Sequence, residues 1–203
     1  RISLYSIVSR IEGSGAFTIR LLNSMTKAEA RIYQKNRILK IENRQQKENL
    51  ICERLTQRLI GAKRVIGYRA DQFEVNIDSV WKDKRLDSID FYFPRVVSKE
   101  KRILEFVKPI GWETGAYGLE EPVGMDLILP QEADLILVPS LGFHQNGFRL
   151  GRGAGFYDRA FREGSTKKMI GILFSELFSI DFPYSDYDIR VGELVTESTV
   201  LFL

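Results

Sequence analysis

The run ADLILVPS at positions 133–140 is the segment that most restricts how this chain folds. It is short, almost continuously apolar and ended by a proline, which is typical of a strand buried on both faces of a sheet. Such strands occur in α/β proteins, where helices cover both sides of the sheet. The run therefore predicts an internal strand of a mostly parallel sheet.

The segment GFRLGRGAGFYDR, positions 147–159, follows that strand and combines four glycines with three arginines. Glycines at 151, 153 and 155 allow several backbone N–H groups to converge on one anion, and the start of a following helix adds a partial positive charge. Arg149 and Arg152 supply charge-assisted donors with a geometry that suits phosphate. We interpret the segment as a polyphosphate-binding loop.

The position of this loop strengthens that interpretation. A loop between a buried strand and a helix lies at the carboxyl end of the strand, where α/β sheets bind ligands. Asp158 follows about one helical turn later, near enough to hold a magnesium ion that bridges phosphate oxygens. The loop lacks the lysine of the GxxxxGK[ST] motif and departs from the dinucleotide motif at its last glycine. The alternative is an ordinary tight connection, which explains the glycines but not the arginines between them.

The rest of the chain alternates helical and strand patterns. A helix capped by Thr26 is expected to reach about Ile41, a second helix to end at Gly61, and a third to run from the glycine loop to Gly164. We expect loops at 72–78 and 111–125, and strands at 64–69, 89–97 (stopped or edged by Pro94), 101–110, 167–175 and 194–203. This order predicts a single three-layer αβα domain with a mostly parallel, Rossmann-like sheet.

Composition narrows the classes of function. With 203 residues, 44% of them hydrophobic and 28% charged, the chain suits one globular domain. No run of about 18 apolar residues is present, so we expect no membrane span. The single cysteine, Cys52, excludes an internal disulfide and a cysteine-based metal site, and it fits a reducing, cytoplasmic environment.

The segment 27–64 is strongly basic, with eleven Lys and Arg against four Asp and Glu. Such an arm can bind nucleic acid or an anionic surface. It has few aromatic residues to stack on bases, so we favour a helix face near a site for an anionic small molecule, with no nucleic-acid partner. Nucleic-acid binding remains the alternative.

Residues 1–24 are expected to be an N-terminal extension before a single domain at 25–203. They contain serines and arginines with one acidic residue, Glu12, a composition that suggests an organelle transit peptide. An upstream extension, with Met25 as the natural start, is the alternative.

The string DLILVPSLGFHQNGFRLGRGAGFYDR, positions 134–159, resembles the signature of the 5-formyltetrahydrofolate cyclo-ligase family. Weaker matches extend from Lys27 to about Val200. The resemblance implies a domain of the NagB/RpiA/CoA-transferase type. It also implies ATP-dependent conversion of 5-formyltetrahydrofolate to 5,10-methenyltetrahydrofolate by a monomer, with ATP and Mg²⁺ as cofactors.

The resemblance also implies a set of site residues. Lys27 and Arg31, one helical turn apart in TKAEAR, match a pair that contacts ATP phosphates, and a spacing of four places both on one helix face. Lys27, Arg149 and Arg152 carry the catalytic role. The ATP site then comprises Lys27, Arg31, Arg149, Leu150, Gly151, Arg152, Gly153, Ala154, Gly155, Phe156 and Tyr157.

The folate and metal sites come from other matched segments. Glu74, in GYRADQFEV, matches a glutamate that contacts folate, and a carboxylate can accept two hydrogen bonds from the amino-pyrimidinone edge of a pterin. Asp158 and Asp188 are the implied magnesium ligands, with Asp186 as the alternative to Asp188. The implied substrate-binding residues are Tyr68, Glu74, Glu121, Arg152, Gly153 and Tyr157.

Five positions depart from the family pattern: Ser140, His144, Ala154, Phe156 and Gly192. His144 stands where the family usually has aspartate; we favour a structural substitution over a general base. None of the departures removes an implied phosphate or magnesium ligand. They leave open a homologue that binds nucleotide or folate without turnover.

Overall fold

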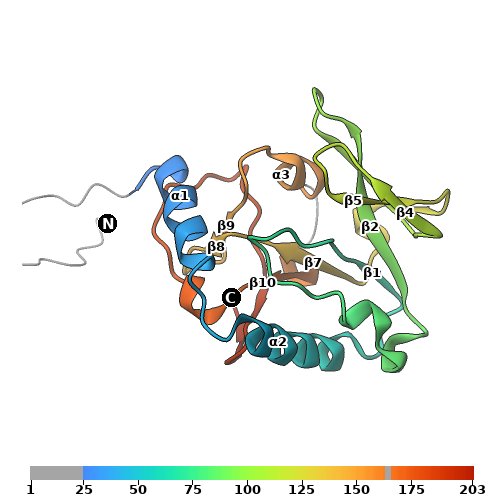
Figure 1. Ribbon diagram of the computed structural model, residues 1–203. Coiled ribbons are helices and arrows are strands. Elements are labelled where there is room, and N and C mark those ends of the chain that lie inside the picture. The colour runs from blue at the N-terminus through green and yellow to red at the C-terminus, as the bar shows by residue number, and fades with distance from the viewer. Residues whose placement is uncertain (1–24, 163–165) are drawn as a thin grey trace, which may run out of the picture.

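The computed structural model describes residues 25–162 and 166–203, so the expectations for 1–24 and for a helix end at Gly164 lie outside the described residues. Its main feature is an eight-stranded sheet (Figure 1). In spatial order the strands are β12 (Val200–Phe202), β11 (Glu193–Val195), β10 (Met169–Ile172), β7 (Leu135–Pro139), β1 (Arg64–Ile66), β2 (Asp90–Ser98), β3 (Ile103–Val107) and β6 (Leu127–Ile128).

The five strands from β11 to β2 are parallel, and the strands beyond them pair antiparallel. Every residue of β7 is buried, which confirms the internal strand expected from the apolar run. The chain leaves β1 toward β2 and later leaves β7 toward β10, in the opposite direction along the sheet. The adjacent carboxyl ends of β1 and β7 therefore form a topological switch point, where open α/β sheets bind ligands.

Helices lie on both sides of this sheet, which confirms the three-layer α/β class. In Figure 1, α2 (Arg44–Leu59) lies below the sheet and α3 (Phe156–Ala160) lies above it. α1 (Lys27–Ile38) begins with the expected cap, because the Thr26 side chain accepts from the N–H of Glu29 and the Glu29 carboxylate accepts from the N–H of Thr26. Single 3₁₀ turns cover Val80–Lys82, Lys84–Leu86, Pro130–Glu132, Thr166–Lys168 and Ser175–Leu177.

The predicted loop at 111–125 was wrong, because this segment forms the hairpin of β4 (Gly111–Thr114) and β5 (Glu120–Val123). Trp112 of β4 packs edge-on against Phe93 of β2, and Arg69 stacks over the Trp112 ring. These tertiary contacts stabilise a strand that the surrounding glycines and proline disfavour. Gly118, with φ +71°, serves the turn.

Several boundaries also differ from expectation, and the strands expected at 64–69, 101–110 and 167–175 are shorter. α1 ends at Ile38, and α2 starts after Asn43, whose left-handed backbone (φ 52°) separates the two helices. The expected last strand is two antiparallel strands, β11 and β12, because Thr196 closes a turn with Thr199. Pro94 does not stop β2, because it pairs with Phe106 of β3; it lies at an edge only on the side of β1, whose pairing with β2 ends at Tyr92.

A second hairpin joins β7 to the glycine loop. It consists of β8 (Gly142–Phe143) and β9 (Arg149–Leu150), and its residues are buried. Ser140 stabilises its base, since the hydroxyl donates to the carbonyls of Gly142 and Leu150. A residue that departs from the family pattern therefore has a structural role here.

Close packing in the sheet predicts a large cost for adding one methyl group at Gly171 of β10. A Cβ there would lie 2.8 Å from Phe143 Cε2 and 2.5 Å from Leu194 Cδ2, both fully buried. Gly171→Ala is expected to lower the free energy of unfolding by about 1–3 kcal/mol, measured by urea denaturation. Gly111→Ala in β4 is the matched control, because no atom lies within 4 Å of its added Cβ. Equal stability of the two variants would contradict this packing.

Candidate active site

A pocket of about 380 Å³ opens beside the carboxyl ends of β1 and β7. Its wall comes from α1, the segment after β1, β2, the β4–β5 hairpin, the glycine loop and the segment before β11. All the site residues expected from the sequence line it except Leu150: Lys27, Arg31, Tyr68, Glu74, Glu121, Arg149, Gly151, Arg152, Gly153, Ala154, Gly155, Phe156, Tyr157, Asp158 and Asp188.

Leu150 supports the loop from beneath. Its side chain is fully buried, and its carbonyl accepts hydrogen bonds from the N–H of Leu141 and the hydroxyl of Ser140. The structure therefore does not bring Leu150 to the pocket wall. Its place next to Arg149 in the strand β9 explains why, since adjacent strand residues point to opposite faces.

The glycine loop requires its glycines. Gly153 (φ +106°) and Gly155 (φ +73°) adopt left-handed conformations that other residues rarely tolerate. The loop also wraps closely around the Arg149 guanidinium, which lies where a side chain on Gly151 would project. The chain thus exposes main-chain groups of this loop to the pocket.

Arg149 anchors the loop to the sheet. Although Arg149 is charged, only 7% of its surface is exposed; its Nε donates to the carbonyl of Pro139, the last residue of β7, at 2.6 Å. Its guanidinium lies over the Tyr157 ring, 4.7 Å from the ring centre. Burial raises the pKa of Tyr157, and the nearby Glu74 acts in the same direction, so this ring stays neutral.

Lys27 and Arg31 of α1 both line the pocket, in keeping with their spacing on one helix face. Arg31 donates from Nε to the carbonyl of Gly151 at 2.8 Å. Lys27 forms an ion pair with Asp188, which also lines the pocket. α1 is thereby joined to both the loop and the segment before β11.

Glu74 is a buried carboxyl in the wall of the pocket. Only 5% of Glu74 is exposed. Burial raises the pKa of Glu74, and Asp71 reinforces the shift, while Arg152 and Arg149 oppose it. Tyr68 also lines the pocket and donates its hydroxyl to the carbonyl of Val75. A buried carboxylate in the pocket wall suits a ligand edge that carries N–H donors.

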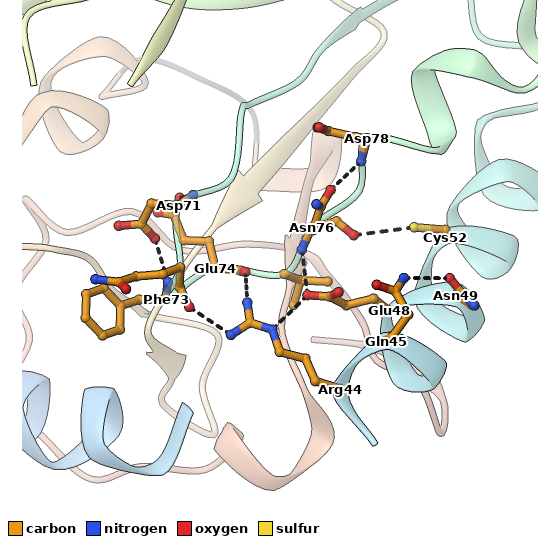
Figure 2. A network of polar contacts seen from close by, with 12 residues as sticks. Arg44, Gln45, Glu48, Asn49, Cys52, Asp71, Phe73, Glu74, Asn76 and Asp78 are labelled. Carbon is orange, nitrogen blue, oxygen red and sulfur yellow. Dashed lines mark hydrogen bonds and ion pairs between the residues drawn. The ribbon is translucent and has the colours of Figure 1, made fainter. Parts of the chain in front are cut away.

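The segment that carries Glu74 is held by α2, as Figure 2 shows. Arg44 donates to the carbonyls of Gln72 (2.8 Å) and Glu74 (2.7 Å), and the Glu48 carboxylate accepts the N–H of Asn76. Cys52 donates to the Asn76 carbonyl at 3.6 Å. Burial raises the pKa of the Cys52 thiol, so the cysteine serves packing here.

Asp158 and Asp188 both line the pocket. The hydrogen bonds that their carboxylates accept indicate which oxygens a metal ion could use. Asp158 accepts the N–H of Ile189 through Oδ1. Asp188 contacts Lys27 through Oδ1 and accepts from the N–H and hydroxyl of Ser185 through Oδ2. The pKa of Asp188 is lowered although burial opposes its ionisation, because Lys27 and Ser185 donate to it. Asp186 is exposed and lies outside the pocket wall.

Over the described residues, 25–162 and 166–203, no group of three or more His, Cys, Asp or Glu side chains is arranged to hold a metal ion. Magnesium commonly uses one or two protein carboxylates and completes its shell with phosphate oxygens and water. The carboxylates of this pocket fit magnesium delivered with a nucleotide, with Asp158 as the one whose Oδ2 has no hydrogen-bond partner among the described residues.

His144 lies outside the pocket wall and is buried. Its Nδ1 accepts the N–H of Asn146, and its ring packs against Tyr184. Burial lowers the pKa of His144. These contacts support the structural interpretation of this residue over a general base.

Two other residues that depart from the family pattern, Gly192 and Phe156, are explained by their packing. Gly192 has no room for a side chain, since an added Cβ would lie 2.8 Å from the Thr166 carbonyl oxygen. Phe156 packs edge-on against Tyr117 of the β4–β5 hairpin at 5.8 Å between ring centres, a contact that needs no hydroxyl.

The structure adds residues that the sequence did not single out. Tyr117 and Glu120 of the hairpin, and Lys35 of α1, line the pocket. Asp71 forms an ion pair with Arg152. Tyr117 and Asp71 lie near matched residues in YGLEEP and GYRADQFEV, but their contacts join segments far apart in sequence. Glu121 also accepts the N–H groups of Val96 and Ala116, which ties the hairpin to β2.

No helix in the described ranges combines the length and apolar character that a membrane span requires. Many basic side chains of 27–64 have acidic partners within the chain. Lys47 pairs with Glu176 and Arg58 pairs with Glu193. This part of the arm thus packs the helices against the rest of the fold.

Fold and site together define an α/β protein with a basic, glycine-lined pocket at the switch point of its sheet. A family model described as the 5-formyltetrahydrofolate cyclo-ligase family matches residues 18–197. The chain belongs to the 5-formyltetrahydrofolate cyclo-ligase family.

Individual relatives agree with this membership. The chain is 26% identical over 191 residues to 5-formyltetrahydrofolate cyclo-ligase of Mus musculus, covering 84% of this chain and 92% of that protein. It is 38% identical over 66 residues to the enzyme of the same name from Mycolicibacterium smegmatis, a match that spans 32% of this chain and about a third (34%) of that protein.

Solved structures support the same fold. The 5,10-methenyltetrahydrofolate synthetase of Aquifex aeolicus aligns with a TM-score of 0.71 and 26% identity, covering 88% of this chain and 93% of that one. A 5,10-methenyltetrahydrofolate synthetase from Mycoplasma pneumoniae aligns with a TM-score of 0.68 over 85% of this chain and 99% of that chain. At 21% identity, the second likeness shows the fold alone.

The raised pKa of Glu74 predicts that this residue lowers stability at neutral pH. A carboxyl whose pKa is higher in the folded state favours folding while protonated and loses that contribution as pH rises through the folded-state pKa. Glu74→Gln is therefore expected to raise the melting temperature at pH 7–8, and to have little effect near pH 4. Gln keeps an oxygen for the N–H of Asp71, which donates to Glu74. Thermal melts across this pH range test the trend, and a lower melting temperature at pH 8 would contradict it.

Proposed function

We propose that this protein catalyses the ATP-dependent cyclisation of 5-formyltetrahydrofolate to 5,10-methenyltetrahydrofolate, with release of ADP and phosphate. Family membership supports the reaction. The observation that carries the assignment to this pocket is the convergence of the glycine loop, the basic side chains and Glu74 on one cavity. The two kinds of group suit the two substrates, a polyphosphate and a pterin.

The nucleotide is assigned to the glycine-loop side. Arg152 belongs to the loop from 151 to 155, and Lys27 and Arg31 also line the pocket. Cationic donors and backbone amides can therefore surround the phosphates. Arg149 is buried beneath the loop and holds its shape. Bound with the nucleotide, Mg²⁺ would neutralise phosphate charge, and Asp158 is the residue best placed to hold it.

The folate is assigned to the part of the pocket around Glu74. The Glu74 carboxylate can accept two hydrogen bonds from the amino-pyrimidinone edge of the pterin. Tyr68, Tyr157 and Glu121 of the hairpin also line the pocket. Arg152 has Asp71 and Glu74 for neighbours and belongs to the glycine loop, so it lies between the two substrates.

The chemistry then needs positioning and charge stabilisation. The formyl oxygen attacks the γ-phosphorus of ATP; the bond to the ADP oxygen breaks and leaves an imidate phosphate. N10 of the folate then attacks the formyl carbon and gives its proton to water, and phosphate departs with the C–O bonding pair. Phosphoryl transfer of this kind requires no covalent nucleophile from the protein. The pocket accordingly contributes cations and amides rather than a nucleophile–base pair.

A direct assay tests the proposal. Purified protein is supplied with ATP and 5-formyltetrahydrofolate, with and without Mg²⁺, and the near-UV absorbance of the methenyl product is followed. Product formation that requires both ATP and Mg²⁺ is the expected result. Binding of either substrate without product would identify a homologue without turnover, and would overturn the proposal.

Arg152→Ala tests the cation between the two substrates. Removing one preorganised donor to developing charge typically lowers turnover about 10²- to 10³-fold, and we expect a loss of kcat in that range. The melting temperature should change little, since the Arg152 side chain is 39% exposed. Arg159→Ala is the matched control, because this exposed arginine of α3 lies outside the pocket wall. If Arg152→Ala kept wild-type turnover, Arg152 would not contact the transferred phosphoryl group, and the assignment would be contradicted.

Asp158→Asn tests the carboxylate assigned to Mg²⁺. The asparagine oxygen can still accept the N–H of Ile189, so the loop geometry is kept while the charge is removed. We expect the Mg²⁺ concentration for half-maximal turnover to rise at least about tenfold, the effect of roughly 1.4 kcal/mol. Asp87→Asn, an exposed position outside the pocket, serves as control. An unchanged Mg²⁺ dependence would assign the ion to other residues.

A further inference from the structure

Asp71 is a charged residue in contact with the site to which the resemblance assigns no role. Its Oδ2 lies 2.5 Å from Nη2 of Arg152. Only 9% of the Asp71 side chain is exposed, against 39% of the Arg152 side chain. In the described part of the chain, Asp71 is the one acidic residue within ion-pair distance of Arg152. The pair joins the segment after β1 to the glycine loop.

The position of the Asp71 carboxylate is set by its own segment. Its Oδ1 accepts the N–H of Phe73 at 2.8 Å, which closes a tight turn. Arg44 of α2 then binds the carbonyls of Gln72 and Glu74 (Figure 2). One carboxylate oxygen is thus used to fix the group, and the other remains for Arg152.

Arg152 needs such a partner. It stands between Gly151 and Gly153, which have no side chains that could restrict its guanidinium. An arginine side chain loses much of its rotamer freedom when it is held in one place. A fixed carboxylate on a different segment restricts the guanidinium before any ligand arrives.

We propose that Asp71 is a positioning residue for Arg152: it holds the guanidinium between the glycine loop and Glu74, so that the remaining N–H groups meet the phosphoryl group passing from ATP to the formyl oxygen. This inference rests on the proposed function. Asp71 itself does not touch the reacting atoms. Its negative charge near the phosphates disfavours their binding, so its benefit falls on kcat rather than on ATP affinity.

Asp71→Asn is the variant of choice, because the asparagine oxygen can still accept the N–H of Phe73 while the charge facing Arg152 is lost. A misplaced catalytic group costs up to about 10²-fold in rate, so we expect kcat to fall about 10- to 100-fold. The KM for ATP should stay the same or decrease. Asp90→Asn is the matched control, since Asp90 pairs with Lys108 at 2.6 Å outside the pocket and should leave kcat unchanged.

The double variant separates positioning from a structural role. In an Arg152→Ala background, Asp71→Asn should change kcat less than about twofold, because its partner is already gone. Multiplicative effects of the two substitutions, or an unchanged kcat in Asp71→Asn, would overturn the inference. A fall in melting temperature with the same kcat per folded molecule would do so as well.

A second measurement uses Arg152→Ala alone, so it does not depend on whether Asp71→Asn folds. Guanidinium chloride at millimolar concentration should restore part of its turnover by occupying the site beside the Asp71 carboxylate. The absence of any restoration would count against the inference. Wild-type protein that forms no methenyl product would remove the proposed function and this inference together, whereas wild-type product with multiplicative variant effects removes the inference alone.

Discussion

The buried guanidinium of Arg149 is the interaction on which the pocket depends. It joins the last carbonyl of β7 to the Tyr157 ring and fills the space inside the glycine loop. A desolvated charge is stable only when hydrogen-bonded and well packed, so these contacts hold the loop in one conformation. The loop thereby becomes a rigid extension of β7, a strand that is buried along its whole length.

Two cations of this pocket form ion pairs with carboxylates from other segments of the chain. Lys27 faces Asp188, and Arg152 faces Asp71, so two of the cations assigned to phosphate each have a carboxylate partner. Such partners limit the motion of long side chains and offset their charge before a ligand binds. A polyphosphate that enters the pocket then meets donors whose positions are largely set, which lowers the entropy lost on binding.

Glu74 shows a conflict between stability and binding. Glu74 is buried with a raised pKa, which disfavours the folded state at neutral pH, yet its segment is tied to α2 through Arg44 and Glu48. Residues that break the usual rules of burial commonly lie at functional sites, where the rest of the fold compensates for them. Here the compensation comes from α2, a helix that does not line the pocket.

The sequence by itself determined the buried strand β7, the glycine loop after it and the placement of Lys27 and Arg31 on one helix face, because these follow from local periodicity and backbone sterics. It also carried the family resemblance that singled out Glu74, Asp158 and Asp188. Only the tertiary structure decided the β4–β5 hairpin, the burial of Leu150 beneath the loop and the contact of Asp71 with Arg152. Each of these depends on contacts between segments distant in the chain, and local propensity contains no information on such contacts.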